Sequence, residues 1–300
     1  MQILLGILFG IAAMVASVPT TWSGHKSGLS GEIHTGIVRH ADKIVGGTEA
    51  TPYRWPWQVG IQSRIVAEDP DVLEDPPGFF CGGSVIDKKW ILTAGHCCVH
   101  MIETRESVEF EVFVGTHRRQ DVQSRDIYAV ARIFIHPHYS NPETGGANDI
   151  CLLELEREVT FNQRVQPVRL THSVWPAGTE CWTSGWGSIN FMVTTVIQAD
   201  ALQNTPVSLV SENNCRNAYV AAGVYMNIGS HSVCALRAGA GPCRTDSGGP
   251  LMCQRGNQWE LVGVTSGGSP YGCGHPLFPS LFANVVNFRD WISSTTGIPF

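Results

Sequence analysis

A serine, a histidine and an aspartate stand in segments whose neighbouring residues suit nucleophilic catalysis. Ser247 lies in GPCRTDSGGPL (241–251). A serine hydroxyl is a weak nucleophile, so it needs a nearby base and donors for the oxyanion that forms when it attacks a carbonyl. Glycines beside it let the backbone approach a substrate closely. Taken alone, this segment also fits an ordinary turn.

The other two residues follow or open apolar segments. His96 comes after the apolar run WILTA and precedes two cysteines, and Asp149 opens the run ICLLEL. A lone histidine at such a place is often a packed structural residue, and an acid there often only ends a loop. If the aspartate is buried beside the histidine, it orients the imidazole and stabilises the imidazolium.

Together the three segments resemble the chymotrypsin/trypsin family of serine peptidases, in the chain order His, Asp, Ser. Further matches follow in order: IVGG (44–47), PWQV (56–59), CGGSVI (81–86), HPHY (136–139), SGWG (184–187) and DWI (290–292). The resemblance covers about residues 44–300. It implies an all-β fold of two packed six-stranded antiparallel β-barrels with a C-terminal helix, and a catalytic site in the cleft between them.

The pattern of short apolar runs independently predicts an antiparallel all-β sandwich or barrel. Strands are expected at 57–61, 84–94, 108–115, 127–136, 150–155, 260–266 and 281–285. Ser211 is expected to cap a short helix, and 285–294 has amphipathic helical spacing. The acidic, proline-rich stretch 67–77 is expected to form an exposed loop; a cation or substrate contact is the alternative.

The composition and net charge limit the classes of function that fit this chain. With 43% hydrophobic and 15% charged residues the chain can bury a sizeable core, and its 32 glycines and 17 prolines follow no period, which predicts many turns. The net charge is −6, and −7 without residues 1–43. No basic surface indicates a nucleic-acid or membrane partner. The family implies protein or peptide substrates and a monomer.

The N-terminus is interpreted as a secretory leader. Residues 1–17 are almost wholly apolar and end in small residues, which predicts a signal peptide and a secreted, extracellular protein; a membrane anchor is the alternative. Residues 18–43 are polar, and the resemblance identifies them as an activation propeptide ahead of the peptidase domain, 44–300. No internal repeat is present.

All ten cysteines follow residue 80, and an even number behind a signal peptide indicates disulfides. Spacing alone fixes no pairing. The resemblance implies four pairs: Cys81–Cys97, Cys181–Cys253, Cys215–Cys234 and Cys243–Cys273. The family fold brings the segments of the remaining two together, so Cys98–Cys151 is inferred as a fifth bridge, with two buried free thiols as the alternative.

Activation also follows from the resemblance. Cleavage after Lys43 by a trypsin-like protease would free the α-amino group of Ile44 to pair with the carboxylate of Asp246, which orders the pocket and the oxyanion hole. A buried carboxylate without its cation is costly, so the uncleaved chain should leave that region disordered.

The specificity pocket maps onto neutral residues. Its base falls on Gly241, followed by Pro242, and its opposite walls fall on Gly268 and Ser280. Cleavage after medium or large apolar residues is expected first, and an elastase-like preference for small residues second. Ser266 is expected to support Asp149 and to line the substrate strand.

Two positions depart from the family pattern. Gly267 replaces a tryptophan, and Thr245 replaces the glycine whose N–H forms the oxyanion hole together with that of Ser247. These departures keep open a second interpretation, a catalytically impaired homologue that acts as a binding protein. Residues 114–121 lack the acidic pair with which some relatives bind calcium, so neither a metal nor a cofactor is expected.

Overall fold

The computed structural model describes residues 44–65, 78–104, 108–141, 146–190 and 196–299. The expected signal peptide, the propeptide, Lys43 and the acidic stretch 67–77 therefore lie outside the described residues. None of the helices in the described part is long and apolar enough to cross a bilayer.

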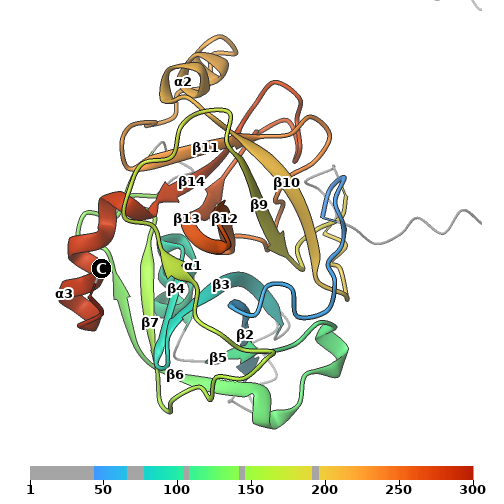
Figure 1. Cartoon of the computed structure of the whole chain (residues 1–300), viewed down its shortest axis with the longest axis vertical. Coiled ribbons are helices and arrows are strands. Elements are labelled where there is room, and N and C mark those ends of the chain that lie inside the picture. Colours follow the sequence, from blue (N-terminus) through green and yellow to red (C-terminus); the bar gives the residue numbers. More distant parts are fainter. Residues whose placement is uncertain (1–43, 66–77, 105–107, 142–145, 191–195, 300) are drawn as a thin grey trace, which may run out of the picture. The chain divides into compact units, whose positions relative to one another are not determined.

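The first barrel closes from six antiparallel strands, in the order β2-β3-β4-β7-β6-β5 (Figure 1). These are β2 (Gln58–Ile65), β3 (Phe79–Asp87), β4 (Trp90–Thr93), β5 (Val108–Val114), β6 (Ile127–Ile135) and β7 (Cys151–Leu155). Helix α1 (Gly95–Thr104) follows β4 directly, so the segment that carries His96 begins where a barrel strand ends.

The second barrel closes in the order β9-β10-β11-β14-β13-β12, again six antiparallel strands. These are β9 (Glu180–Gly185), β10 (Gln203–Val210), β11 (Ser232–Leu236), β12 (Pro250–Arg255), β13 (Gln258–Gly267) and β14 (Ser280–Asn284). The short strand β1 (Thr48–Glu49) pairs with β10, and the short strand β8 (Arg169–Leu170) pairs with β13. The two barrels confirm the fold predicted from the sequence.

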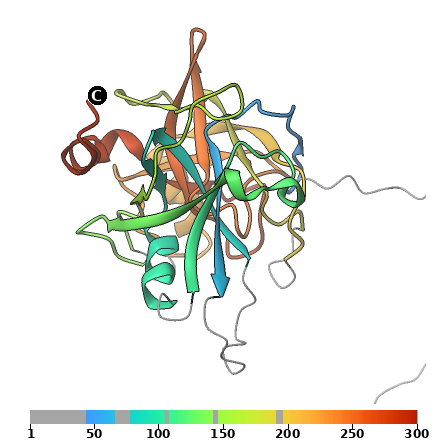
Figure 2. The same ribbon diagram turned by 90° about the horizontal axis from the view of Figure 1, so that it is seen from below.

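Among the described residues, three short α-helices lie outside the sheets, and 3-10 helices form at Arg119–Asp121 and Ser124–Asp126. Besides α1 the α-helices are α2 (Glu212–Val220) and α3 (Arg289–Thr296), with a 3-10 turn at Val285–Phe288 before α3. Ser211 caps α2 as predicted, because its Oγ accepts a hydrogen bond from Asn214 N. Helix α3 lies at the periphery of the strands in both views (Figures 1 and 2). It packs through Trp291 against His136, just after β6.

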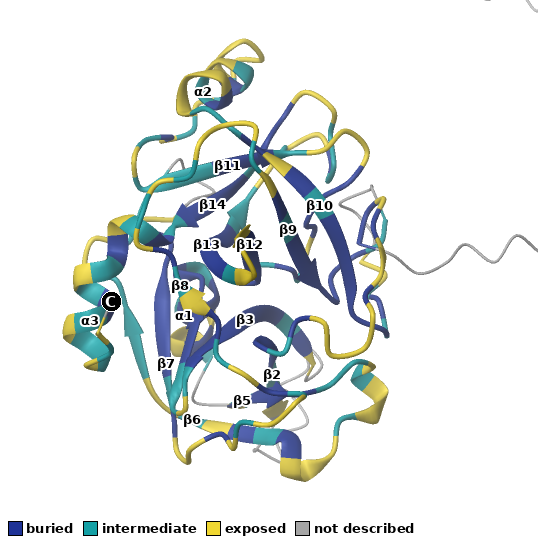
Figure 3. Cartoon of the chain, in the orientation of Figure 1, coloured by how far each residue is buried: buried dark blue, intermediate teal, exposed yellow. Residues whose placement is uncertain are grey.

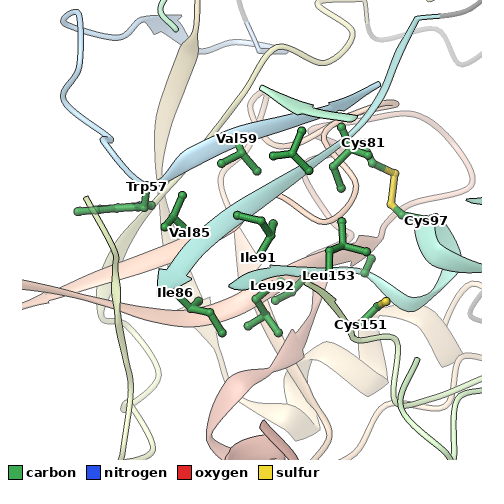
Figure 4. Packing of buried hydrophobic residues seen from close by; sticks show 14 of the residues in the cluster. Trp57, Val59, Cys81, Val85, Ile86, Ile91, Leu92, Cys97, Cys151 and Leu153 are labelled. Atoms are coloured by element: carbon green, nitrogen blue, oxygen red, sulfur yellow. A yellow bond between two sulfur atoms is a disulfide. The ribbon is translucent and has the colours of Figure 1, made fainter. Parts of the chain in front are cut away.

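The core explains why these segments form strands. Strands such as β3, β7 and β9 are buried along most of their length, whereas exposed residues gather on helices and turns (Figure 3). In the first barrel, Val59, Val85, Ile91 and Leu153 pack in one apolar cluster (Figure 4). Burying each side chain of this size contributes about 1.5–3 kcal/mol to the stability of the fold. The barrel interior therefore stabilises the strand that leads to His96.

The structure corrects two details of the strand prediction. Residues 84–94 do not form one strand: β3 ends at Asp87, a tight turn follows, and β4 begins at Trp90. The Asp87 carboxylate accepts the backbone N–H of Lys88, which favours the turn over a continuous strand. Strands β9 to β12 were not predicted as a set, because their apolar residues are interrupted by polar ones.

The structure contains five disulfides, and all ten cysteines take part in them. The pairs are Cys81–Cys97, Cys98–Cys151, Cys181–Cys253, Cys215–Cys234 and Cys243–Cys273. These are the pairs expected from the sequence, including the additional bridge between Cys98 and Cys151.

Candidate active site

The carboxylate of Asp149 makes three short contacts. Its Oδ2 lies 2.8 Å from His96 Nδ1, and its Oδ1 accepts the backbone N–H of His96 at 2.8 Å. Ser266 donates its hydroxyl to Oδ2 at 2.6 Å. Asp149 is buried, while the His96 side chain keeps 28% of its surface exposed. The imidazole is thus fixed at Nδ1 by a buried carboxylate, an arrangement suited to a general base.

Local backbone geometry places Asp149 at the start of β7. The preceding residue, Asn148, has a φ of +56°, a conformation that asparagine tolerates better than most side chains. Its side-chain amide donates to the carbonyl of His138 at 2.8 Å, which holds this turn against the loop after β6. The sequence analysis did not identify Asn148, although an Asn-Asp pair before an apolar strand was a signal for such a turn.

The Ser247 segment lies against the segment that carries His96. The Ser247 carbonyl accepts the N–H of Gly82 at 2.7 Å, and Gly82 follows Cys81, which is bonded to Cys97 beside His96. Gly248 has a φ of +79°, and a Cβ placed there would lie 2.1 Å from Thr93 Oγ1 on β4. Only glycine fits this contact, so the turn after Ser247 can pack directly on the strand that leads to His96.

Thr245 occupies the position predicted to supply an oxyanion-hole donor. Asp246 N donates to Cys243 O at 2.9 Å, which makes 243–246 a β-turn with Arg244 and Thr245 at its centre. Thr245 has a φ of +68° at the place where type II turns require glycine or asparagine. Its Oγ1 is buried and has no hydrogen-bond partner among the described residues. The threonine therefore keeps a glycine-like backbone at the cost of strain and an unpaired hydroxyl.

Asp246 is fully buried behind that turn. Its Oδ1 accepts the N–H of Gly187 at 2.8 Å and its Oδ2 that of Cys243 at 3.0 Å. Burial raises the pKa of Asp246 to about 7, although these two hydrogen bonds oppose the shift. In the described part of the chain no lysine, arginine or histidine forms an ion pair with it.

The segment that begins at Ile44 packs beside the predicted pocket. Ile44 and Val45 are completely buried, and the carbonyl of Val45 accepts the N–H of Gly241 at 3.1 Å. A Cβ on Gly46 would lie 1.9 Å from the Gly239 carbonyl oxygen, so the two backbones touch. The predicted activation segment and the predicted pocket base are therefore direct neighbours.

The residues assigned to the pocket are all neutral, and two of them are close neighbours. A Cβ on Gly241 would lie 3.3 Å from Ser280 Oγ, so base and wall face each other closely. Pro242 is buried, and Gly268 is exposed. Nothing lies within 4 Å of a Cβ built on Gly267 or Gly268, so both positions border open space. The Cys243–Cys273 disulfide ties the base to the loop before β14.

One group of side chains among the described residues has the spacing of a metal site. The donor atoms of Cys81, His96 and Cys97 lie within 4.8 Å of one another. Both sulfurs are already joined in a disulfide, and His96 Nδ1 faces Asp149. This group has no thiolate to offer a metal.

Comparison with known proteins assigns the family. A family model described as Trypsin matches residues 44–292. Trypsin-2 of Salmo salar is 37% identical over 257 residues, 85% of this chain and 95% of that protein. Trypsin-1 of Salmo salar is 36% identical over 257 residues, 85% of this chain and 91% of that protein.

A human relative has a longer chain. Transmembrane protease serine 5 of Homo sapiens is 35% identical over 261 residues, which are 85% of this chain and 52% of that protein. The family match, the paired barrels and the clustered His96, Asp149 and Ser247 segments agree with one another. The chain belongs to the trypsin family of serine endopeptidases.

Proposed function

We propose that this chain is the secreted precursor of an endopeptidase in which His96, Asp149 and Ser247 form the catalytic triad. The observation that carries this proposal is the geometry of Asp149, whose buried carboxylate holds both the Nδ1 and the backbone N–H of His96. A binding protein has no need for a buried acid that fixes the tautomer of a partly exposed histidine.

In this mechanism His96 removes the proton from Ser247 Oγ as the oxygen attacks the scissile carbonyl. Asp149 keeps the proton of His96 on Nδ1 and stabilises the imidazolium, and the Ser266 hydroxyl donates a further hydrogen bond to its carboxylate. The backbone N–H groups of Thr245 and Ser247 bind the oxyanion. His96 then protonates the leaving amine, and water hydrolyses the acyl-enzyme through the same base.

Activation is proposed to follow cleavage after Lys43 by a trypsin-like protease. The carboxylate of Asp246 is buried without a cation, and the Ile44 segment is buried next to the same pocket. A freed α-ammonium of Ile44 would supply the missing charge. Residues 1–17 are proposed as a signal peptide and 18–43 as the propeptide that this cleavage releases, giving a secreted monomer whose domain spans 44–300.

Substrate choice is proposed to favour apolar residues before the scissile bond. Neither Gly241, Gly268 nor Ser280 carries a carboxylate, so a lysine or arginine side chain would enter the pocket without a partner. The Ser280 hydroxyl lies 3.3 Å from the point where a Cβ on Gly241 would stand, so it occupies space near the predicted pocket base and favours medium apolar residues. An elastase-like preference for small residues is the second choice.

A second candidate function is a binding protein with impaired catalysis. Thr245 motivates it, because a β-branched residue at a φ of +68° strains the oxyanion turn. Gly267 borders open space and has no side chain that could form a wall against a substrate. This absence also favours the binding function.

Labelling with a fluorophosphonate distinguishes the two functions. Protein cleaved after Lys43 should label on Ser247, whereas the Lys43→Gln precursor and the Ser247→Ala variant should not. An unlabelled, correctly cleaved and folded protein would favour the binding function. Equal labelling of the precursor would contradict the activation step alone.

A further inference from the structure

The strands β5 and β6 close the first barrel along only part of their length. They pair over three residue pairs, from Glu111–Ala129 to Phe113–Ile127. Beyond these pairs the two strands diverge (Figure 2): Val108–Phe110 pairs with β2 alone, and Val130–Ile135 pairs with β7 alone. Each of these two stretches therefore has one strand edge without a neighbour among the described residues.

A groove of about 690 Å³ lies between the two open edges, and the second half of α1 forms its third side. Its apolar lining comes from all three elements and includes Met101, Ile102, Val108, Phe110, Val130 and Phe134. The Ile102 side chain is 39% exposed, and none of the β6 residues that line the groove is buried. A partner bound in the groove would therefore cover apolar surface that is now in contact with water.

The open edges indicate the kind of partner that fits. Backbone N–H and C=O groups require hydrogen-bond partners, and the edge of a sheet offers such groups to another strand. An extended peptide can add to the edge, where its backbone forms the hydrogen bonds and its alternate side chains fill apolar pockets. The stretch Val130–Ile135 spans about 20 Å at the rise of a strand, which fits a segment of about five or six residues.

The charge of the groove narrows the choice further. Three charged residues line it, Glu109, Arg132 and Glu156. Glu109 forms an ion pair with Arg64, and Arg132 forms one with Glu154. The carboxylate of Glu156 is exposed and forms no ion pair or hydrogen bond with any described residue. The groove therefore carries one uncompensated negative charge, which favours a lysine or arginine in the partner.

We propose that this β5–β6 groove binds an extended segment of a partner protein, which adds as a strand to an open edge. The segment has apolar side chains at alternate positions and a lysine or arginine that pairs with Glu156.

The groove is distinct from the catalytic site. His96 stands in the first turn of α1, whereas Met101 and Ile102 lie about 8–9 Å further along the helix. A segment bound in the groove would thus leave the triad free, and the inference does not depend on the proposed peptidase activity.

The test is the binding of fluorescein-labelled peptides to the cleaved Ser247→Ala protein, in which the probe stays intact. The probes are peptides of alternating valine and threonine in which one lysine replaces each residue in turn. By fluorescence anisotropy the best lysine probe should bind about three- to tenfold more tightly than its glutamine counterpart, in the range of an exposed charge pair. The advantage should shrink from about 50 to 500 mM salt.

Methylation of the probe backbone distinguishes strand addition from apolar contact alone. N-methyl groups on alternate residues remove the N–H donors from one edge of the peptide and leave every side chain unchanged. At least one of the two alternate sets should weaken binding by about tenfold or more, because several main-chain hydrogen bonds are lost together.

Two variants of the protein locate the site. Glu156→Gln should remove the lysine advantage while the glutamine probe still binds, and Ile102→Lys should abolish binding of the lysine probe. The matched controls are Glu180→Gln and Val220→Lys. Glu180 is an exposed glutamate on β9 that forms no ion pair with a described residue, and Val220 is an exposed apolar residue at the end of α2. Both controls should bind the probes like the unaltered protein.

Three results would overturn the proposal: no binding of any probe, binding that neither N-methyl set weakens, or a lysine advantage that survives Glu156→Gln. The same proteins test two other occupants. A dimer in sedimentation that Ile102→Lys dissociates would assign the groove to a second copy of the chain. Loss of probe binding in the Lys43→Gln precursor alone would assign it to residues 18–43. Either result overturns the assignment to a partner protein.

Discussion

Cys98 and Cys151 form a completely buried disulfide, and each lies two residues beyond a member of the His96–Asp149 pair. The bridge therefore joins α1, just after His96, to β7, just after Asp149. Hydrogen bonds already connect these residues, and the covalent link limits how far the two elements can separate.

Removing this bridge should affect catalysis as well as stability. We expect Cys98→Ala with Cys151→Ala to lower the free energy of unfolding by about 2–4 kcal/mol. We also expect kcat to fall on the order of tenfold, because small misplacements of a base are costly. Urea unfolding and ester hydrolysis measure the two effects. Removal of the Cys215–Cys234 bridge is the control, and it should lower stability without changing kcat. If both variants have the same kcat, the Cys98–Cys151 bridge does not position the catalytic residues.

The pH dependence of precursor stability should report the buried Asp246. Its pKa is raised to about 7 in the folded chain, so between pH 4 and 7 the folded state holds a proton that the unfolded state has lost. Stability is greatest below pH 4, falls as the pH rises to about 7, and then levels off. The Lys43→Gln precursor should show this fall in urea unfolding.

Two controls isolate that titration. Asp246→Asn should remove the component of the pH dependence due to this residue, and cleavage after Lys43 should abolish it because an ammonium would keep the carboxylate ionised. A precursor whose stability between pH 4 and 7 matches that of the asparagine variant would contradict the assignment.

Replacing Thr245 should separate strain from catalysis. The φ of +68° gives Thr245 the backbone conformation that a glycine would adopt, so we expect its N–H to remain an oxyanion donor. We therefore expect Thr245→Gly to raise kcat on a small ester by less than about tenfold, well below the 10²–10³ of a lost oxyanion donor. Protein inhibitors should bind the glycine variant more tightly if, as the sequence predicts, the threonine side chain obstructs the leaving-group side.

Thr245→Val is the matched variant for stability. Valine keeps the branched shape and the strained φ but lacks the hydroxyl, which is buried without a partner. We expect it to raise the free energy of unfolding by about 1 kcal/mol with little change in kcat. If neither variant changes kcat, inhibitor affinity or stability, Thr245 is neutral at this position.

A carboxylate placed at the pocket base should reverse the substrate preference. The cleaved enzyme is expected to favour apolar residues before the scissile bond and to disfavour lysine and arginine. Gly241→Asp with Ser280→Gly, which makes room at the 3.3 Å contact, should raise kcat/KM for arginine peptides at least about tenfold. Ser280→Gly alone is the control, and a dominant arginine preference in the unaltered enzyme would refute the neutral-pocket assignment.

The secondary structure of a segment was predicted correctly from the sequence where short-range interactions determine it. Ser211 caps α2, and the periodic run before the C-terminus forms α3 with its 3-10 turn, because capping and amphipathic spacing are short-range effects. The strands of the first barrel were also predicted, apart from the first half of β3 and the turn between Asp87 and Trp90, because most of their apolar runs are long and distinct.

Features that depend on distant partners were not predictable from the residues alone. Helix α1 lacks a recognisable cap in the sequence, and it forms where disulfides hold Cys97 and Cys98. One of the two backbone N–H groups that bond to the Asp246 carboxylate belongs to Gly187, which lies 59 residues away in the sequence. The disulfide pairs were expected from the resemblance, whereas the backbone conformation of Thr245 could be seen only in the structure.

The disulfides also divide the molecule. Two bridges lie within the first barrel and three within the second, and since all ten cysteines are accounted for, no bridge runs between the barrels. The chain crosses between the barrels from β1 to β2 and again from β7 to β8, and contacts such as Gln58–Ser184 and Asp149–Ser266 also hold the barrels together. A single nick between residues 156 and 179 would thus let a denaturant alone, without any reductant, separate a fragment with His96 and Asp149 from one with Ser247.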